Sequence, residues 1–145
     1  MTEPCVFCQI IRHEAPHSSI YENEKTMAFL SNRPINPGHT LVIPKKHYET
    51  IHQISEEEMA HIYVVVKRIT EAVNKAINPE GIRIVQNNGE AAGQVIPHFH
   101  VHVIPMYRQM PTFQGDIREQ AALENDAERI RLFIQKTQYV PSGHN

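Results

Sequence analysis

The sequence has 145 residues and a mass of 16.7 kDa, which is the size of one domain and leaves no room for two sizeable cores. Its apolar fraction of 41% is enough for a packed interior, and its net charge of −2 offers no bulk attraction to nucleic acids or to membranes. The N-terminus lacks an apolar signal run, and no apolar stretch approaches about 18 residues. We therefore expect a soluble, cytoplasmic protein that binds neither nucleic acid nor membrane.

The spacing of apolar, proline and glycine residues predicts about five strands and one principal helix. In chain order, we expect a short helical or turn segment over 9–14, strands over 20–22, 25–30 and 39–43, a long helix over 55–77, strands over 82–86 and 97–105, and a second helix over 124–135. This order favours an α+β fold, in which a largely antiparallel sheet packs on the principal helix. We expect a single domain over residues 1–145, with its core at about 5–105 and a polar tail over 106–145.

The long helix carries its own start signal and an apolar stripe. Ser55 can cap its N-terminus, with Glu58 three residues later as the partner in a capping box. Apolar residues recur at spacings of three and four, and this pattern is typical of a helix face that packs in a core. The stripe consists of Met59, Ile62, Val66, Ile69, Val73 and Ala76.

Histidine and apolar residues alternate strictly between Pro97 and Pro105. In a β-strand, alternate side chains point to the same face, so His98, His100 and His102 would project together, about 6.5–7 Å apart, while the apolar residues between them enter the core. Imidazole can bind a metal ion, and it can act as a nucleophile or as an acid and base near neutral pH. The pattern alone leaves these functions open.

Two cysteines stand three positions apart, as Cys5-Val6-Phe7-Cys8. A disulfide across so short a loop would constrain little chain entropy. In a reducing cytosol, such a motif is usually half of a zinc site or a redox pair. The redox motif is expected within a βαβ unit, whereas these cysteines lie at the extreme N-terminus, which favours zinc. Ten histidines supply candidate partners, and spacing alone does not identify them.

The loop before the histidines, with the sequence NGEAAG over 88–93, suits an anion. Its two glycines allow backbone N–H groups to approach phosphate oxygens closely, and Gln94 adds a side-chain amide. A neutral imidazole beside this loop can attack phosphorus and form a phospho-histidine intermediate. A second imidazole can protonate the leaving group and then activate water.

Three segments resemble the histidine triad (HIT) family. The segment His98-Phe99-His100-Val101-His102-Val103-Ile104 is similar to the triad motif, in which His-x-His-x-His precedes two apolar residues. The sequence PGHTLVIPK over 37–45 resembles the family's third-strand signature, and NNGEAAGQ over 87–94 resembles its phosphate loop. The resemblance spans roughly residues 5–105 and implies a HIT-like α+β fold in a homodimer whose two sheets join.

The resemblance also implies the roles of particular residues. His100 would be the nucleophile that attacks the α-phosphate of a purine nucleotide derivative, with His39 and His102 flanking that phosphate. The mononucleotide would then be released from a nucleotidyl-histidine intermediate. Contacts to the phosphate or ribose would come from Asn87, Gly93 and Gln94.

Relatives with a similar N-terminal cysteine pair hold zinc with both cysteines, with a histidine after the third strand and with the first histidine of the triad. Carried over by position, the ligands would be Cys5, Cys8, His47 and His98. Two cysteines and two histidines form a closed tetrahedral set, so this zinc would be structural. It would attach the N-terminal segment to the back of the histidine strand.

Two positions depart from the family pattern. Ser31 stands where many relatives use an acidic residue or Asn to bind the ribose hydroxyls, and the neighbouring Asn32 can compensate. Val95 stands where phosphoramidase members have Ser and dinucleotide polyphosphate hydrolases often have Thr, and valine donates no hydrogen bond.

The leading prediction is a nucleotidyl hydrolase or transferase acting on a nucleoside phosphoramidate or a similar compound. The alternatives are a diadenosine polyphosphate hydrolase and a nucleotide-binding or scaffold protein with incidental turnover.

Overall fold

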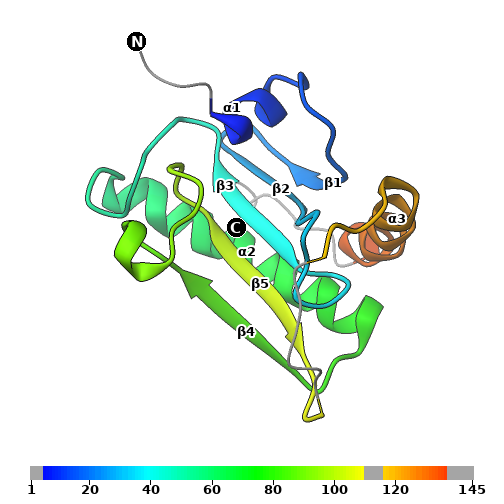
Figure 1. Ribbon diagram of the computed structural model, residues 1–145. Coiled ribbons are helices and arrows are strands. Elements are labelled where there is room, and N and C mark those ends of the chain that lie inside the picture. The colour runs from blue at the N-terminus through cyan, green and yellow to red at the C-terminus, as the bar shows by residue number, and fades with distance from the viewer. Residues whose placement is uncertain (1–4, 110–115, 137–145) are drawn as a thin grey trace, which may run out of the picture.

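Antiparallel strands form one sheet in the computed structural model, which describes residues 5–109 and 116–136. Within these residues the strands are Ser19–Glu22 (β1), Thr26–Leu30 (β2), Thr40–Pro44 (β3), Gly81–Gln86 (β4) and Val101–Met106 (β5). The sheet has the order β1-β2-β3-β5-β4, and every neighbouring pair is antiparallel (Figure 1). The helices are Val6–Ile11 (α1), Glu56–Ile77 (α2), the 3₁₀ turn Glu90–Ala92 (η1) and Gln120–Lys136 (α3). The predicted α+β fold with a five-stranded antiparallel sheet is confirmed.

Helix α2 covers one face of the sheet (Figure 1). Ile62, Val66, Ile69 and Val73 of the predicted stripe are buried, and Met59 and Ala76 at its ends are partly buried. Val65 and Ala72 are also buried, and the helix packs against Val42 of β3 and Val101 of β5. The hydroxyl of Ser55 accepts a hydrogen bond from the backbone N–H of Glu58 at 3.1 Å, which confirms the predicted cap. The carboxylate of Glu58 accepts a hydrogen bond from the Tyr48 hydroxyl at 2.7 Å, which ties the helix start to the segment after β3.

The short helix α1 packs on the opposite face. Phe7 and Ile10 form a second apolar cluster with side chains of β2 and β3, including Phe29 and Leu41. Because both faces of the middle of the sheet are covered, every residue of β2 and β3 is buried. The predicted position of the N-terminal helix, 9–14, is wrong by about one turn, since α1 starts at Val6, directly after Cys5.

Helix α3 confirms the second predicted helix, although it begins at Gln120. Leu123, Ala127 and Ile130 are buried in the main core beside α2, so this part of the predicted polar tail contributes to the interior. Residues 110–115 and 137–145 of that tail lie outside the described residues. Among the helices described, none has the length and apolar character needed to cross a membrane.

The predicted histidine strand is wrong in its first four residues. Strand β5 begins at Val101, because the backbone before it bonds to loops and not to the neighbouring strands. The N–H of His98 donates to the carbonyl of Ile96 at 2.8 Å, and the N–H of Phe99 donates to the carbonyl of Tyr48 at 2.7 Å. The backbone at His98 therefore leaves the sheet, and the three triad histidines do not line a single strand.

Candidate functional site

The histidines of the predicted triad separate into two groups. His100 and His102 stay together, with ring centroids 4.9 Å apart, and His39 joins them with its ring 5.2 Å from that of His102. His98 instead belongs to a cluster with the two cysteines and His47. The sheet brings the first group together, because β3 and β5 are neighbours and Leu41, two residues after His39, is paired with His102.

The hydrogen bonds of His39 and His102 define where their protons lie. The N–H of Ile35 donates to Nδ1 of His39 at 3.0 Å, so the proton of the neutral His39 ring is on Nε2. This Nε2 is 3.0 Å from Nδ1 of His102, to which it donates. The proton of the neutral His102 ring is therefore on Nε2, where it can be donated to a ligand.

His100 has the opposite tautomer. Its Nδ1 lies 2.7 Å from the backbone carbonyl of His98, and a carbonyl oxygen can only accept, so Nδ1 carries the proton. The Nε2 atom of His100 is then left with a free lone pair. The site thus presents an unprotonated nitrogen on His100 beside an N–H donor on His102.

Burial keeps these three rings neutral. It lowers the pKa of His39 to about 3 and that of His102 to about 4, with a smaller contribution from neighbouring histidines. Burial also lowers the pKa of His100, against the opposing effect of its hydrogen bond to the His98 carbonyl. A neutral imidazole is the form that can act as a nucleophile.

Helix α1 supports the ring of His100 from the N-terminal side. The ring of Phe7 meets the ring of His100 edge-on, with centroids 5.2 Å apart, and the ring of His98 at 5.8 Å. Sequence reasoning missed Phe7, and it also missed Ile35, whose backbone N–H sets the tautomer of His39. Neither position carries a signal in the sequence, because both act by contact with distant segments.

The predicted phosphate loop is held from within. The amide of Gln94 accepts from the N–H of Gly89 at 2.7 Å and donates to the carbonyls of Glu49 and Ile96 at 2.6 and 3.2 Å. Gln94 therefore braces the loop here, and its contact with a phosphate stays a prediction. Gly93 has a φ of +96°, a conformation that strains any residue with a Cβ.

The other predicted ligand contacts lie at the ends of strands. Asn87 follows β4, and its amide forms no hydrogen bond within the described part of the chain. Ser31 follows β2, and its N–H donates to the carbonyl of His39 at 2.9 Å, which places it beside the predicted catalytic residues. Asn32 is exposed, and its carbonyl accepts from the N–H of Arg118 at 2.8 Å. Arg118 was also missed, because its partner lies 86 positions earlier in the chain.

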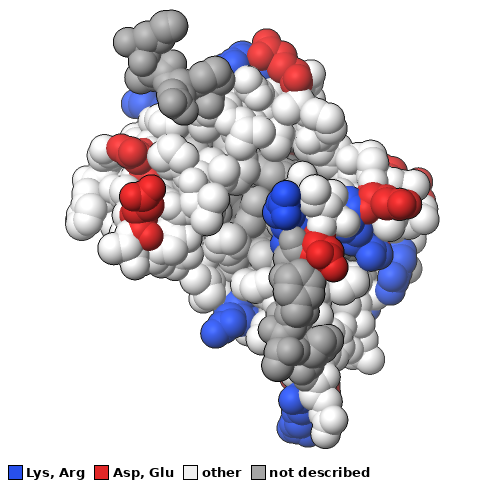
Figure 2. All heavy atoms as spheres, in the orientation of Figure 1, with Lys and Arg blue, Asp and Glu red and all other residues white. Residues whose placement is uncertain are grey.

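Charged side chains are unevenly spread over the face of the sheet that carries α1. Figure 2 shows both basic and acidic side chains on the α3 side of this face, and a separate acidic group at the opposite margin.

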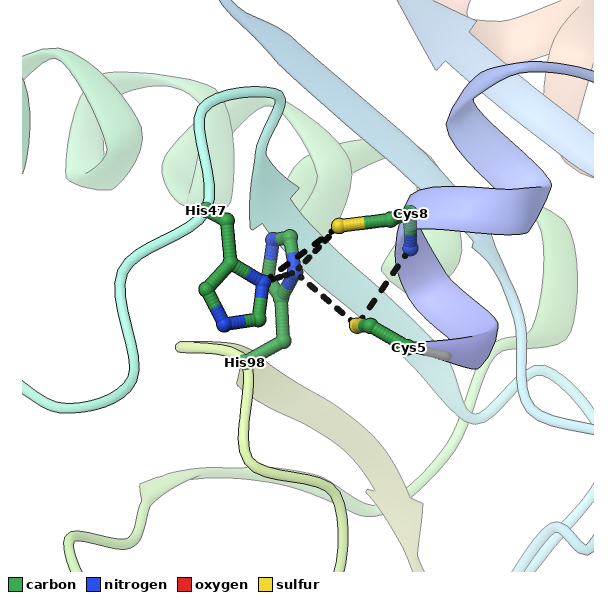
Figure 3. Close-up of side chains that lie close together, drawn as sticks. All are labelled: Cys5, Cys8, His47 and His98. Carbon is green, nitrogen blue, oxygen red and sulfur yellow. Dashed lines mark hydrogen bonds between the residues drawn. The ribbon is translucent and has the colours of Figure 1, made fainter. Parts of the chain in front are cut away.

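The second group of residues converges on one point. Figure 3 shows Cys5 and Cys8 at α1, His47 after β3 and His98 before β5, with their side chains directed toward one another. Their ligand atoms all lie within 4.8 Å of one another. Nδ1 of His98 is 3.4 Å from Sγ of Cys5, 3.7 Å from Sγ of Cys8 and 3.1 Å from Nδ1 of His47.

These separations fit a tetrahedral metal ion. With bonds of about 2.0–2.3 Å, the ligand atoms of such an ion stand about 3.3–3.8 Å apart. Nε2 of His98 donates to the carbonyl of Pro44 at 2.9 Å, which leaves the Nδ1 lone pair of the ring facing both sulfur atoms. The four residues could therefore hold a metal ion, as the resemblance implied.

The acidity of the thiols also agrees with a bound metal ion. Burial, together with the neighbouring Cys5, raises the pKa of Cys8 to about 11. The Cys8 thiol therefore resists ionisation unless a cation is present, and a bound divalent cation deprotonates the thiols that coordinate it.

Comparisons with known proteins agree with this geometry. A family model described as HIT domain matches residues 12–109. Adenosine 5'-monophosphoramidase hnt1 of Schizosaccharomyces pombe is 42% identical over 101 residues, which are 70% of this chain and 73% of that protein.

Two solved structures extend the match to the fold. A hypothetical histidine triad nucleotide-binding protein of Sulfolobus tokodaii strain7 has a TM-score of 0.86 at 36% identity, covering 92% of this chain and 94% of its own. A Zn-bound histidine triad family protein of Mycobacterium smegmatis has a TM-score of 0.79 at 34% identity, again covering 92% of this chain and 94% of its own. The neutral, paired histidines thus stand within a known scaffold, and the chain belongs to the HIT domain family, the histidine triad proteins.

Proposed function

We propose that this protein is a nucleotidyl hydrolase or transferase in which Nε2 of His100 attacks the α-phosphate of a purine nucleotide derivative. The observation that carries the proposal is the 2.7 Å hydrogen bond from Nδ1 of His100 to the His98 carbonyl. This hydrogen bond holds the proton on Nδ1, so the free lone pair is on Nε2, and burial favours the neutral ring. A nucleophile of this kind divides one difficult transfer into two easier steps.

In the first step, Nε2 of His100 forms a bond to phosphorus, and the leaving group departs with the electron pair of its bond and takes up one proton from solvent water. The N–H of His102 then stabilises the charge on the phosphate oxygens, and His39 holds His102 in the donating tautomer. In the second step, water attacks phosphorus, the N–P bond breaks with its electron pair returning to Nε2, and one proton is released with the mononucleotide.

Residues around these histidines supply the remaining contacts in the proposal. Asn87 and Gly93 hold the phosphate, with Gln94 bracing their loop or contacting the phosphate directly. Ser31 and Asn32 face the ribose. The amide of Asn87 supports this role, since it has no partner within the described residues.

The substrate class that we propose is a nucleoside phosphoramidate or a similar compound. Its support is the Schizosaccharomyces pombe relative, whose name describes an adenosine 5'-monophosphoramidase. The test is chromatography of the products formed from an adenosine phosphoramidate and, in parallel, from diadenosine tetraphosphate. We expect AMP from the phosphoramidate with the wild type and at least about 10⁴-fold less with His100→Ala, because no other group provides the nucleophile.

The matched control is His52→Ala, which removes an exposed histidine outside the site and should leave the rate unchanged. If the wild type released AMP from diadenosine tetraphosphate but not from the phosphoramidate, the chain would be assigned to the dinucleotide polyphosphate hydrolases. If His100→Ala turned over either substrate at the wild-type rate, His100 would not be the nucleophile. If the wild type turned over neither substrate, the result would favour a nucleotide-binding protein.

We further propose that Cys5, Cys8, His47 and His98 hold a structural zinc ion. The four ligands leave no open coordination position for a substrate, so the ion would supply stability and not chemistry. The distances of 3.1–3.7 Å from Nδ1 of His98 to the other three ligand atoms and the Zn-bound relative from Mycobacterium smegmatis support this choice.

A homodimer with joined sheets is also part of the proposal. Strand β4 lies at the edge of the sheet order, and its Ile84 is 45% exposed, so its outer side offers unpaired backbone groups to a second copy. Light scattering should give about twice the chain mass of 16.7 kDa, and a mass of one chain would contradict the dimer.

A further inference from the structure

His98 takes part in both groups of histidines at once. Its imidazole belongs to the cluster with the cysteines, while its backbone carbonyl accepts the Nδ1 proton of His100. The residue is fully buried, so no bulk water replaces either partner. One residue therefore connects the cluster to the ring of His100.

The His98 backbone is held by bonds between two distant segments. Its N–H donates to the carbonyl of Ile96, and the next N–H, that of Phe99, donates to the carbonyl of Tyr48 at 2.7 Å. Tyr48 directly follows His47, which is another member of the cluster. An ion shared by His47 and His98 would hold together the same two segments that this backbone bond joins.

The cluster by itself fixes the His98 ring only on one side. Nε2 of His98 donates to the carbonyl of Pro44, but Nδ1 faces the thiols of Cys5 and Cys8 and the ring of His47. Thiols are weak hydrogen-bond donors, whereas coordination to a cation would fix Nδ1 strongly. His47 is exposed, so the cluster is open to exchange of its ion with the solvent.

We propose that the metal occupancy of this cluster sets the tautomer of His100. With the ion bound, the His98 carbonyl stays in place, the proton of His100 is held on Nδ1, and Nε2 has a free lone pair. With the ion removed, the His98 peptide moves, and His100 also populates the tautomer with the proton on Nε2, which cannot attack phosphorus. His98 is thus a positioning residue for the nucleophile, and the cluster controls the site rather than only stapling the N-terminus.

The test reads the tautomer directly. Protein labelled with ¹⁵N at histidine is studied by long-range ¹H–¹⁵N NMR at pH 7.5, and the His100 signals are assigned by their loss in His100→Ala. We expect zinc-loaded protein to show a protonated Nδ1 and an unprotonated Nε2 on His100. Removal of zinc by a chelator should shift both signals toward an average of the two tautomers, and one equivalent of zinc should restore them. Unchanged signals in folded, zinc-free protein would overturn the proposal.

A pair of variants covers the case in which the zinc-free protein unfolds. His47→Ala removes an exposed ligand without opening the core, and His47→Cys replaces it with another zinc ligand. With equal zinc added, we expect mixed tautomers of His100 in His47→Ala and the wild-type tautomer in His47→Cys, with His52→Ala as the unaffected control. Identical His100 signals in the two His47 variants, measured where only His47→Cys retains zinc, would also overturn the proposal.

The kinetic consequence rests on the proposed function, but the NMR test does not. If His100 is the nucleophile, the rate of forming the nucleotidyl intermediate should fall about tenfold or more in His47→Ala, with little change in KM, and it should recover in His47→Cys. If the wild type turns over neither nucleotide, the proposed function fails while the tautomer measurement still decides this inference. Zinc-dependent tautomers with a zinc-independent rate would contradict the link to catalysis.

Discussion

The protonation of single imidazoles determines what this site can do. His39, His100 and His102 lie where charge is poorly solvated, and each has a lowered pKa. Their hydrogen bonds then assign each proton to one of the two ring nitrogens. A site of neutral rings with fixed tautomers needs no proton loss before attack on phosphorus.

The activity should therefore persist below the pH at which an ordinary histidine is protonated. Because the pKa of His100 is lowered and those of His39 and His102 are about 3 and about 4, we expect the acidic limb of kcat/KM to lie below pH 6.5. The measurement is kcat/KM from pH 4 to 8 with the nucleotide that is turned over. A half-maximal value at or above pH 6.5 would contradict neutral, desolvated rings.

Stability should depend on pH through the same groups. Between pH 6.5 and about 3, His39 binds a proton in the unfolded chain but not in the folded protein, so the free energy of unfolding decreases as the pH falls. The contribution is complete above pH 6.5, and the loss by pH 4 is of the order of 3 kcal/mol. Urea unfolding from pH 4 to 7 measures it.

The variant His39→Gln provides the control for this prediction. It removes the titrating group, so the slope of stability against pH should fall by about 1.4 kcal/mol per pH unit between pH 6 and 4. An unchanged slope would mean that His39 is not kept neutral by folding.

At the scale of elements, the start of α2 depends on one side chain. The hydroxyl of Ser55 satisfies the N–H of Glu58, which otherwise has no partner within the helix. We expect Ser55→Ala to lower the free energy of unfolding by about 1 kcal/mol, and Ser55→Gly to lower it by only a few tenths. Urea unfolding of both variants at pH 7 makes the comparison. Equal losses would contradict a capping role for the hydroxyl.

Helix α3 is connected to the site through one ion pair. The carboxylate of Asp126, which is 4% exposed, accepts two hydrogen bonds from the guanidinium of Arg118, at 2.8 and 3.3 Å. The backbone of Arg118 in turn bonds to Asn32, in the loop that supplies the N–H of Ile35 to His39. The pair therefore helps to hold that loop.

Removing the Asp126 carboxylate should weaken both the fold and this loop. We expect Asp126→Ala to lower the free energy of unfolding by about 2–3 kcal/mol, because it leaves a half-buried guanidinium without its partner. Hydrogen exchange at the Ile35 N–H should become faster. The control on the same helix is Glu124→Ala, which breaks the half-buried but more solvent-accessible pair with Arg131 and should cost less than about 1 kcal/mol. Equal losses in the two variants would contradict this account.

At the scale of the whole molecule, the cluster joins the N-terminus to the middle of the sheet. Cys5 and Cys8 stand on either side of Phe7 of the second apolar cluster, while His47 follows β3 and His98 precedes β5. Purified protein should contain about one zinc per chain, and Cys5→Ser/Cys8→Ser should lose the zinc and melt at a lower temperature, because binding energy of the metal contributes to folding. Metal analysis and thermal unfolding measure both. Val6→Ser, at an exposed position between the cysteines, is the control, and full zinc content in the double variant would contradict the ligand assignment.

The sequence by itself determined most of the elements, because their signals are local. The stripe and cap of α2 and the apolar strands β2 and β3 follow from the spacing of neighbouring residues. The triad motif marked the catalytic candidates His100 and His102, and the segment that resembles the family's third strand marked His39. These features depend on residues that are close in sequence, so a periodic pattern records them.

Only the tertiary structure decided how the histidines are divided. A hydrogen bond from Phe99 to Tyr48, about 50 positions away, delays the start of β5 and turns His98 toward the cysteines. The bracing role of Gln94 and the contact of Arg118 with Asn32 likewise join segments that are distant in the chain. Such bonds form only when the chain has folded, and no local pattern records them. The alternation predicted three histidines on one face. In the folded protein, His98 lies in the cluster with the cysteines, whereas His100 and His102 lie in the candidate active site.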